Sequence, residues 1–292
     1  MKLVDVDNTL IRYLRDNKPI ERFDLMIDIE NQESASHAEK WIGTKNKTCL
    51  KEFILSTNLY GASFTLPDEL LLCENLTKIR VSATKGIHSV LMTTSQHQHP
   101  VIINCFSLRE LHSDGVRISE EILHDILSSC SLLVKIELLN SCEGVKTIKV
   151  KKLQRLYELR IHLYHEDVHS TPLEISDLPN LGVFSCNLRP RQWLNPHPCL
   201  FNSHSISLGS SVTELMLGGV ILDKERVDMI KSEFPFLESL TLHMTSWMLG
   251  SFHFTCASIK RLYLLLCPDI LIDVQVYAPK LLFFPVQRRH IA

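Results

Sequence analysis

Apolar and polar residues alternate along this chain in short segments that share one spacing. In the clearest segment, Leu237, Leu240 and Leu242 have the spacing L-x-x-L-x-L. Polar Ser239 and Thr241 alternate with these leucines. Alternation with a period of two residues predicts a strand that buries one face and exposes the other. Because a single strand of this kind cannot bury its own apolar face, it needs similar strands beside it.

The same three-position frame recurs at nine other places in the sequence. They are Leu50/Phe53/Leu55, Leu76/Ile79/Val81, Leu108/Leu111/Ser113, Leu133/Ile136/Leu138, Leu156/Leu159/Ile161, Leu181/Phe184/Cys186, Val212/Leu215/Leu217, Ile259/Leu262/Leu264 and Leu281/Phe284/Val286. The first positions of successive frames lie 22 to 32 residues apart. This overlaps the period of about 20–29 residues that is typical of leucine-rich repeats. The recurrence favours stacked repeats over a series of unrelated amphipathic strands.

The frames predict an α/β fold of the leucine-rich-repeat class. We expect a single right-handed solenoid (horseshoe), with parallel strands on its concave face and irregular helices or loops on its convex face. A solenoid grows along one axis without forming separate cores, so residues 1–292 are expected to form one domain. Residues 1–48 would hold atypical repeats and residues 49–292 the clearer ones.

The segments outside the frames predict a few helices and several loops. Helices are expected at residues 5–16, after a cap at Ser36, after a cap at Ser119 and from Asp223 onward. A further strand is expected at residues 20–27. Loops are expected at residues 96–100, 165–172 and 189–198, of which the last is rich in proline.

Composition excludes several classes of protein. With 45% hydrophobic and 22% charged residues, the chain is too apolar to be disordered. Its formal net charge of -2 gives no general attraction to nucleic acid or to an anionic membrane. The longest apolar run, residues 262–267, is too short to span a bilayer, and the N-terminus lacks the apolar region of a signal peptide. We expect neither nucleic acid nor membrane as a partner.

The cysteines indicate a reducing compartment. There are nine of them, an odd number, and no C-x-x-C pair. Several lie beside or within the frames, as buried small apolar residues do. A disulfide framework is therefore not expected. We expect the protein in the cytoplasm, in the nucleus or in both.

Several segments, in this order and spacing, resemble the plant F-box/leucine-rich-repeat family. They are residues 6–10 (VDNTL), 15–23 (RDNKPIERF), 41–42 (WI), 66–76 (LPDELLLCENL), 108–112 (LRELH), 127–130 (LSSC) and 277–281 (YAPKL). A complete member of this family would be the substrate receptor of an SCF-type ubiquitin ligase. The resemblance implies that its F-box holds a Skp-type adaptor and, through it, a cullin, while its repeats hold the protein to be marked.

The F-box itself is not expected in this chain. In the family it precedes the segment that here begins near residue 5, which leaves no room for it. Residues 66–70 resemble the start of an F-box, but they lead directly into the strand at Leu76, so they are interpreted as a turn within a repeat. The C-terminal FBD-type extension of many relatives is not evident either. The chain then corresponds to the protein-binding part of a receptor or, alternatively, to a free-standing scaffold or decoy.

One short segment near the N-terminus also allows a catalytic interpretation. Asp5-Val6-Asp7-Asn8-Thr9 resembles the D-x-D-x-T opening of haloacid-dehalogenase-type phosphatases, in which the first Asp is the nucleophile. That chemistry needs a doubly wound sheet, whereas a solenoid would hold possible partners such as Thr241, Lys260 and Asp269 far apart. We interpret Asp7 as a helix cap and expect no catalytic residue and no cofactor.

Histidines form two groups with spacings compatible with a metal site. One contains His162, His165 and His169, and the other His97 and His99. No cysteine or carboxylate completes a set of four ligands, so no metal is expected.

The candidate binding residues are the polar positions of the concave face. The frame places them two and four residues after each first position, with two histidines one step further. They are Lys78, Arg80, Lys135, Glu137, Glu158, Arg160, His162, Glu214, Met216, Thr241, His243, Arg261 and Tyr263. Both signs of charge with a Tyr and a Met indicate a polypeptide-binding surface, centred on the repeats of Lys135 and Arg160. The alternative is a solvated face whose charges pair across strands.

Overall fold

The recurring frame forms the interior of the protein. The computed structural model describes residues 19–43, 49–84, 88–93, 103–140, 145, 147–165, 173–190, 206–222, 224–247, 251–266 and 273–288. In the nine frames that begin between Leu50 and Ile259, each residue is at most 4% exposed. This includes Ser113, the one polar frame residue, at 1%. The predicted inward register is therefore confirmed for these nine repeats.

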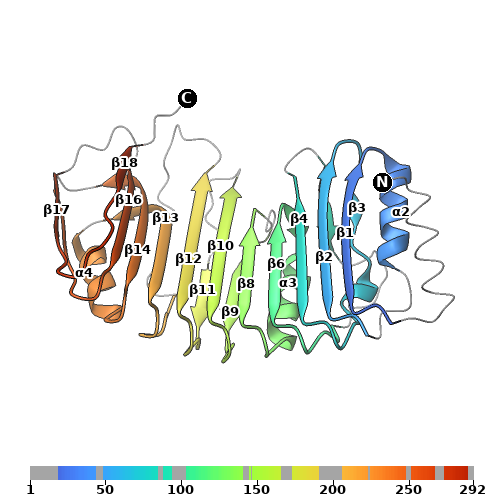
Figure 1. Ribbon diagram of the computed structural model, residues 1–292, viewed down its shortest axis with the longest axis horizontal. Helices are drawn as coiled ribbons and strands as arrows, with labels where there is room; N and C mark the ends of the chain where they lie inside the picture. Colours follow the sequence, from blue (N-terminus) through green and yellow to red (C-terminus); the bar gives the residue numbers. More distant parts are fainter. Residues whose placement is uncertain are drawn as a thin grey trace. The chain divides into compact units, whose positions relative to one another are not determined.

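The chain divides into two compact units, residues 1–149 and 150–292, which are described separately. In the first unit, the main sheet consists of parallel strands that lie side by side in chain order (Figure 1). They are β1 (Arg22–Ile29), β2 (Glu52–Leu59), β4 (Lys78–Ala83), β6 (Glu110–Asp114) and β8 (Lys135–Leu139). The predicted strand at residues 20–27 is β1. That the whole chain forms a single domain stays a prediction.

The second unit repeats this arrangement. Its main strands are again parallel and in chain order (Figure 1). They are β10 (Glu158–His165), β12 (Val183–Pro190), β13 (Glu214–Leu222), β14 (Ser239–Trp247), β16 (Arg261–Leu266) and β18 (Val286–Arg288). Both units are therefore leucine-rich-repeat solenoids, as the frames predicted.

One backbone carbonyl just before each main strand fixes the register of the next strand. The carbonyl oxygen of Glu21 accepts hydrogen bonds from the N–H groups of Lys51 (2.7 Å) and Glu52 (3.0 Å). The same two-donor pattern recurs along both units. We call these acceptors the carbonyl seam: Glu21, Lys51, Thr77 and Arg109 in the first unit, and Tyr157, Gly182, Thr213, Glu238 and Lys260 in the second.

Short parallel strands, which the sequence did not predict, lie outside the main sheet. The first unit contains a three-stranded sheet of β3 (Phe64–Thr65), β5 (Val90–Met92) and β7 (Val116–Ile118). In the second unit, β15 (Ser251–Thr255) pairs with β17 (Asp273–Tyr277), and β11 (Leu173–Ser176) contacts the end of β9 (Ile148–Lys151). The expectation of only helices and loops here was therefore incomplete. The missed signal was a single apolar alternation, as at Val90 and Met92, which are both buried.

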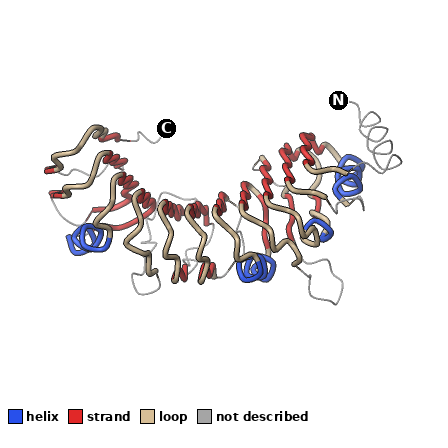
Figure 2. The backbone as a smooth tube through the Cα atoms, turned by 60° about the horizontal axis from the view of Figure 1, so that its bottom comes forward, coloured by secondary structure: helices blue, strands red, loops and turns tan. Residues whose placement is uncertain are grey.

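Helices occupy part of the side opposite the main strands within each unit (Figure 2). The helix α3 (Glu120–Ser129) begins after Ser119, whose hydroxyl accepts a hydrogen bond from the N–H of Ile122, as predicted. The helix α4 (Lys224–Glu233) occupies the segment predicted to open at Asp223. The predicted turn at residues 66–70 contains η1 (Asp68–Leu70), a 3-10 helix of three residues.

The first described helix begins earlier than predicted. α2 (Gln32–Ile42) is capped by Asn31, whose side chain accepts from the N–H of Ser34, while the Ser34 hydroxyl accepts from the N–H of Asn31. Ser36, the predicted cap, lies inside the helix and donates to the carbonyl of Gln32 (2.9 Å). The reciprocal pair satisfies two N–H groups at once, which a cap at Ser36 would leave without partners.

Some predicted elements lie outside the described residues. These are the helix at 5–16 and the loops at 96–100, 166–172 and 191–198. At the borders of these loops, His165 ends β10, and Arg189 and Pro190 end β12.

Small cysteines fill positions three residues ahead of the frames. The sulfur atoms of Cys105 and Cys130, ahead of Leu108 and Leu133, lie 3.8 Å apart and are fully buried. The hydrogen bond with Cys105, together with burial, raises the pKa of the Cys130 thiol, which donates to the Cys105 carbonyl. The described cysteines are free: Cys49, Cys73, Cys105, Cys130, Cys186 and Cys256.

The tenth frame differs from the other nine. Phe284 is 37% exposed and Val286 is 43% exposed, although both were predicted to be inward residues. In the described structure, β18 has a partner strand, β16, on one side only. The apolar side chains of this repeat therefore lack the second neighbour that buries the equivalent residues elsewhere.

Candidate functional site: the open faces of the main sheets

Most residues between the frame positions are accessible and form the open face of each main sheet, whereas Ser185 and Asn187 at such positions are buried. In β4, Ile79 and Val81 are buried, whereas Lys78 and Arg80 are accessible. Strand pairing aligns such residues into rows. In the first unit, the first row is Arg22, Glu52, Lys78, Glu110 and Lys135, and the second row is Asp24, Ile54, Arg80, His112 and Glu137.

In the second unit, the same counting gives three rows. The first is Glu158, Val183, Glu214, Ser239 and Arg261; the second is Arg160, Ser185, Met216, Thr241 and Tyr263; the third is His162, Asn187, Gly218, His243 and Leu265. The thirteen predicted binding residues all lie in these rows, four in the first unit and nine in the second. Their role in binding stays a prediction, and the predicted centre around Lys135 and Arg160 draws on both units.

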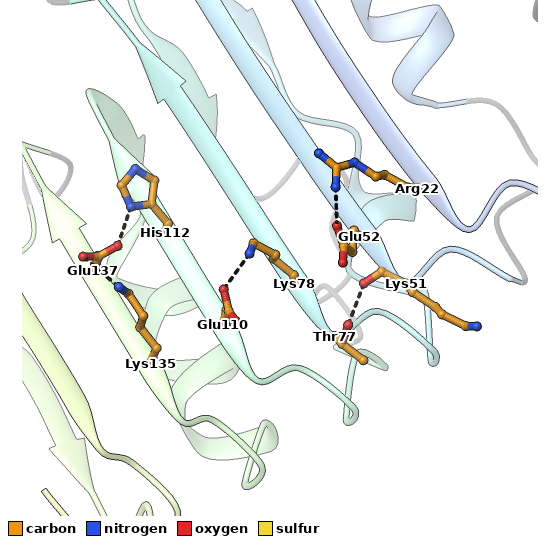
Figure 3. A network of polar contacts seen from close by, with 9 residues as sticks. All are labelled: Arg22, Lys51, Glu52, Thr77, Lys78, Glu110, His112, Lys135 and Glu137. Atoms are coloured by element: carbon orange, nitrogen blue, oxygen red, sulfur yellow. Dashed lines mark hydrogen bonds and ion pairs between the residues drawn. The ribbon is translucent and has the colours of Figure 1, made fainter. Parts of the chain in front are cut away.

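Charges alternate in sign along the first row of the first unit. Arg22 pairs with Glu52 (3.2 Å) and Lys78 pairs with Glu110 (2.8 Å), each across neighbouring strands (Figure 3). The side chains are 27–57% exposed. Exposed pairs of this kind contribute about 0–1 kcal/mol each, so the row defines a charge pattern more than it stabilises the fold.

A tighter polar group lies in the same unit, where His112 and Lys135 both contact Glu137 (Figure 3). The Nδ1 atom of His112 is 2.8 Å from one carboxylate oxygen, and the Lys135 ammonium is 3.3 Å from the other. The Glu137 side chain is only 13% exposed. Burial alone would raise the pKa of Glu137, but the hydrogen bonds and charges of His112 and Lys135 lower it below its ordinary value of 4.5.

This lowered pKa predicts a pH dependence of stability. Since folding favours the ionised carboxylate, the contribution of Glu137 should be fully present above about pH 4.5 and decline as the pH falls through the folded-state pKa. We expect Glu137→Gln to lower the melting temperature at pH 7 and to have a smaller effect at pH 3.5. Thermal melts of both proteins across this range measure the difference. An equal or growing deficit at low pH would contradict the ionised, paired state.

Ser82, His112 and Glu137 together form a chain of hydrogen bonds. The hydroxyl of Ser82 is 3.3 Å from Nε2 of His112, whose Nδ1 contacts Glu137. Hydroxyl, imidazole and carboxylate occur in this order in serine hydrolases. Acyl transfer also needs N–H donors aimed at the developing oxyanion, but strands β4 and β6 are paired in the sheet, which uses their N–H groups. The arrangement therefore favours a role in ordering the surface.

Arg80 differs from its neighbours in being exposed and having no ion pair or hydrogen bond within the described part of the chain. It lies between Ile54 on β2 and His112 on β6. The N–H groups of the Arg80 guanidinium can therefore donate to a carboxylate or a carbonyl of a partner without competing with a contact among the described residues. Of the predicted residues in the first unit, Arg80 is thus the best placed to contact a partner.

Charges in the second unit are also paired. Arg160 donates to the carboxylate of Glu158 on the same strand. Arg261 contacts Glu214 at 2.8 Å, reaching over the intervening strand β14, where the row position is the small Ser239. The open face of this unit therefore carries two compensated charge pairs, Glu214–Arg261 within the first row and Glu158–Arg160 between the first and second rows.

The other rows of the second unit are mostly neutral. The Nε2 atom of His162 is 2.7 Å from the hydroxyl of Ser185. The rings of His243 and Tyr263 meet edge to face, with centroids 6.3 Å apart, and Met216 and Thr241 lie in the second row. Tyrosine, histidine and methionine offer apolar contact area together with hydrogen-bonding groups, a combination typical of protein-binding surfaces.

Sequence reasoning omitted several residues of these rows. His112, Glu110 and Ser185 all occupy the frame positions that were used for the predicted residues. Counting two and four residues from Leu108 and Leu181 would have identified them.

Most residues of the catalytic and metal-binding alternatives are not among those that the structure describes. The string Asp5 to Thr9, Asp269 and the side chains of His97, His99, His165 and His169 lie outside the described residues. Lys260, a possible partner of the string, contacts Glu238 at 2.7 Å. Among the described residues, no group of three or more His, Cys, Asp or Glu side chains could hold a metal ion. None of the described helices combines the length and the apolar character needed to cross a membrane.

Comparison with known proteins assigns the repeats to a family. The family model described as "FBD-associated F-box protein At5g56370, LRR repeats" matches residues 38–184. The matched segment begins in α2 and ends in β12, and the chain belongs to this family of leucine-rich-repeat proteins. No curated protein and no solved structure matches it. The resemblance to F-box/leucine-rich-repeat proteins inferred from the sequence is thus confirmed for the repeats.

Proposed function

We propose that this protein is the substrate-recognition part of an SCF-type ubiquitin ligase receptor. The family and the solenoid fold support a protein-binding leucine-rich-repeat domain. The observation that carries the proposal further is that the matching family model describes the repeats of an F-box protein. In such a receptor the repeats hold the protein to be marked, while a Skp-type adaptor and a cullin supply the rest of the ligase. A cytoplasmic or nuclear location is part of the proposal.

Recognition would use the open faces of the main sheets. Parallel strands stacked by the carbonyl seam hold the row residues at fixed spacings, so little side-chain entropy is lost on binding. The alternating charges of Glu158 and Arg160, or of Lys78 and Glu110, select a partner by complementarity more than they add net affinity. Arg80 and Met216 have no hydrogen bond or ion pair among the described residues and can supply new contacts, whereas the Tyr263 hydroxyl already donates to the side-chain oxygen of Gln287.

A charge swap tests the use of this face. Glu158→Lys/Arg160→Glu exchanges the positions of the negative and the positive charge, with lysine as the cation, so an intramolecular ion pair and the fold should be kept. We expect the double variant to lose proteins that the wild type captures from a cell extract. An exposed pair outside the main sheet, Lys151 and Glu174 (2.6 Å), provides the matched control. Swapping these two should leave the captured set unchanged.

Two outcomes would redirect the proposal. An unchanged captured set in the Glu158/Arg160 variant would place recognition away from this face, for example on the far side of the repeats. If partners are captured without a Skp-type adaptor or cullin, and their ubiquitination does not change when the protein is depleted, the protein would be a scaffold or decoy.

A further inference from the structure

The open face of the first unit contains one cation that has no counter-charge within the described part of the chain. That cation is Arg80, an exposed residue of β4 with neither an ion pair nor a hydrogen bond among the described residues. Every other described charged residue of this face has a partner: Arg22 contacts Asp24 and Glu52, Lys78 contacts Glu110, His112 and Lys135 contact Glu137, Asn58 donates to Asp28, and Asn140 donates to Asp114. Arg80 is therefore the position at which this face can attract a negative charge.

The residues around Arg80 leave its charge uncompensated. Strand pairing places the apolar Ile54 on one side of it and His112 on the other. The carboxylates at the diagonal positions, those of Glu52 and Glu110, are held by Arg22 and Lys78. A carboxylate supplied by a partner would thus gain the Arg80 guanidinium without displacing an existing ion pair.

A second unused donor lies close to Arg80. Ile54 and Ser56 are both partly accessible on the same face of β2, and the Ser56 hydroxyl makes no hydrogen bond among the described residues. Ser56 lies in register with Ser82, two residues after Arg80, and such diagonal neighbours are about 7–8 Å apart, within reach of a long side chain. A carboxylate at Arg80 can therefore also accept from Ser56, while Ile54 offers apolar contact to the methylene groups of the acid. We call Ile54, Ser56 and Arg80 the Arg80 site.

The same face does not suit a polyanion such as nucleic acid. A chain of phosphates needs several cations to replace its counterions, whereas Arg80 is the one unpaired cation of this face within the described ranges. The carboxylates of Glu52, Glu110 and Glu137 lie in the same two rows and would repel further negative charges. The face thus favours a single carboxylate in an otherwise weakly charged segment.

We propose that the Arg80 site binds an aspartate or glutamate side chain within a segment of the partner protein. The planar guanidinium can donate two N–H groups to the two carboxylate oxygens, which fixes the orientation of the bound acid. This proposal rests on the proposed function, in which the open faces hold the protein to be marked, and it adds the chemistry of the segment that is recognised.

Binding of peptides to the purified full chain tests this proposal. Random peptides displayed on phage are selected on the wild type, and an enriched sequence is synthesised with a fluorescent label for anisotropy measurements. We expect the enriched sequences to share an acidic residue. Arg80→Gln in the protein, or replacement of that acid by its amide in the peptide, should each weaken binding by about 10- to 100-fold. Together, the two changes should weaken it little more than either alone, because both remove the same contact.

Arg117→Gln is the matched control, because Arg117 is an exposed arginine of the same unit that lies on β7, outside the main sheet. This variant should bind the peptide like the wild type, and circular dichroism spectra check that each variant is folded.

Three results would overturn the proposal: a selection that yields no binding peptide, enriched peptides without an acidic residue, or an affinity that Arg80→Gln leaves unchanged. Tighter binding of a peptide with phosphoserine in place of the acid would also overturn it, since phosphate and not carboxylate would then be the ligand. The charge swap at Glu158 and Arg160 lies in the second unit, so it tests the proposed function independently of the Arg80 site.

Discussion

Replacing Leu240 by alanine is expected to lower the free energy of unfolding by about 2–5 kcal/mol. Leu240 is 1% exposed and lies in register between Leu215 on β13 and Leu262 on β16. The substitution removes apolar area and leaves a cavity that two packed repeats can close only partly, because their strands are held by main-chain hydrogen bonds. Urea denaturation of the wild type and the variant measures the loss.

Thr241 provides the matched control for this prediction. It is the next residue on the same strand and lies on the open face, paired in register with Met216 and Tyr263. Thr241→Ala should change the free energy of unfolding by at most about 0.5 kcal/mol, as surface substitutions usually do. Similar losses in the two variants would mean that the inward and outward faces of β14 do not differ as the structure has them.

A second large effect is expected at Gly115, between β6 and β7. Its φ angle is +69°, and a Cβ atom at this position would lie 2.4 Å from the carbonyl oxygen of Ala83. Its N–H group donates to the carbonyl of Leu139 (2.9 Å), which ties the turn to β8. Gly115→Ala combines a strained dihedral angle with a displaced backbone, so we expect a loss of about 2–4 kcal/mol.

Gly209 serves as its control, since a Cβ atom there would meet its nearest neighbour, the carbonyl oxygen of Leu178, at an ordinary 3.4 Å. Gly209→Ala should be nearly neutral or slightly stabilising, because alanine restricts the unfolded chain. Urea denaturation of both variants is the measurement. If Gly115→Ala were as stable as Gly209→Ala, the turn would have to accommodate a side chain by moving away from Ala83.

The main sheet could be predicted from the sequence because its signal is local. Burial of one face of a strand requires an apolar residue at every second position, and frames such as Leu237/Leu240/Leu242 show this directly. Repetition then supplies what a single strand lacks, namely the identity of its neighbours. For these reasons the sequence placed nine inward frames correctly.

Other elements were not predicted correctly, either because their sequence pattern is too short or because more than one residue could fulfil the same role. β5 contains only three residues, too few for alternation to separate a strand from a loop. At α2, both Asn31 and Ser36 are possible capping residues, and the outcome depends on the reciprocal hydrogen bonds between Asn31 and Ser34. Local competition between caps of similar strength cannot be resolved from residue type alone.

The candidate site, too, could be predicted from the sequence only in part. The frame correctly assigns Lys78 and Arg80 to the open face, since this depends only on position within the strand. Which of the two is paired depends on the neighbouring strand, where Glu110 lies in register with Lys78 and His112 with Arg80. The sequence shows which face of the sheet a residue occupies. Its ion pairs and hydrogen bonds depend on the residues that lie in register with it on the neighbouring strands.

Because of the carbonyl seam, the position of a surface residue within its row does not depend on how many residues connect its strand to the preceding one. The step from Leu181 to Val212 is among the longest, yet Ser185 still lies beside Met216, because the carbonyl of Gly182 receives the N–H groups of Thr213 and Glu214. The number of residues in the connection between two main strands therefore does not alter the register of those strands. Relatives can gain or lose residues there without shifting any residue within its row, and they can acquire a new partner by point substitutions alone.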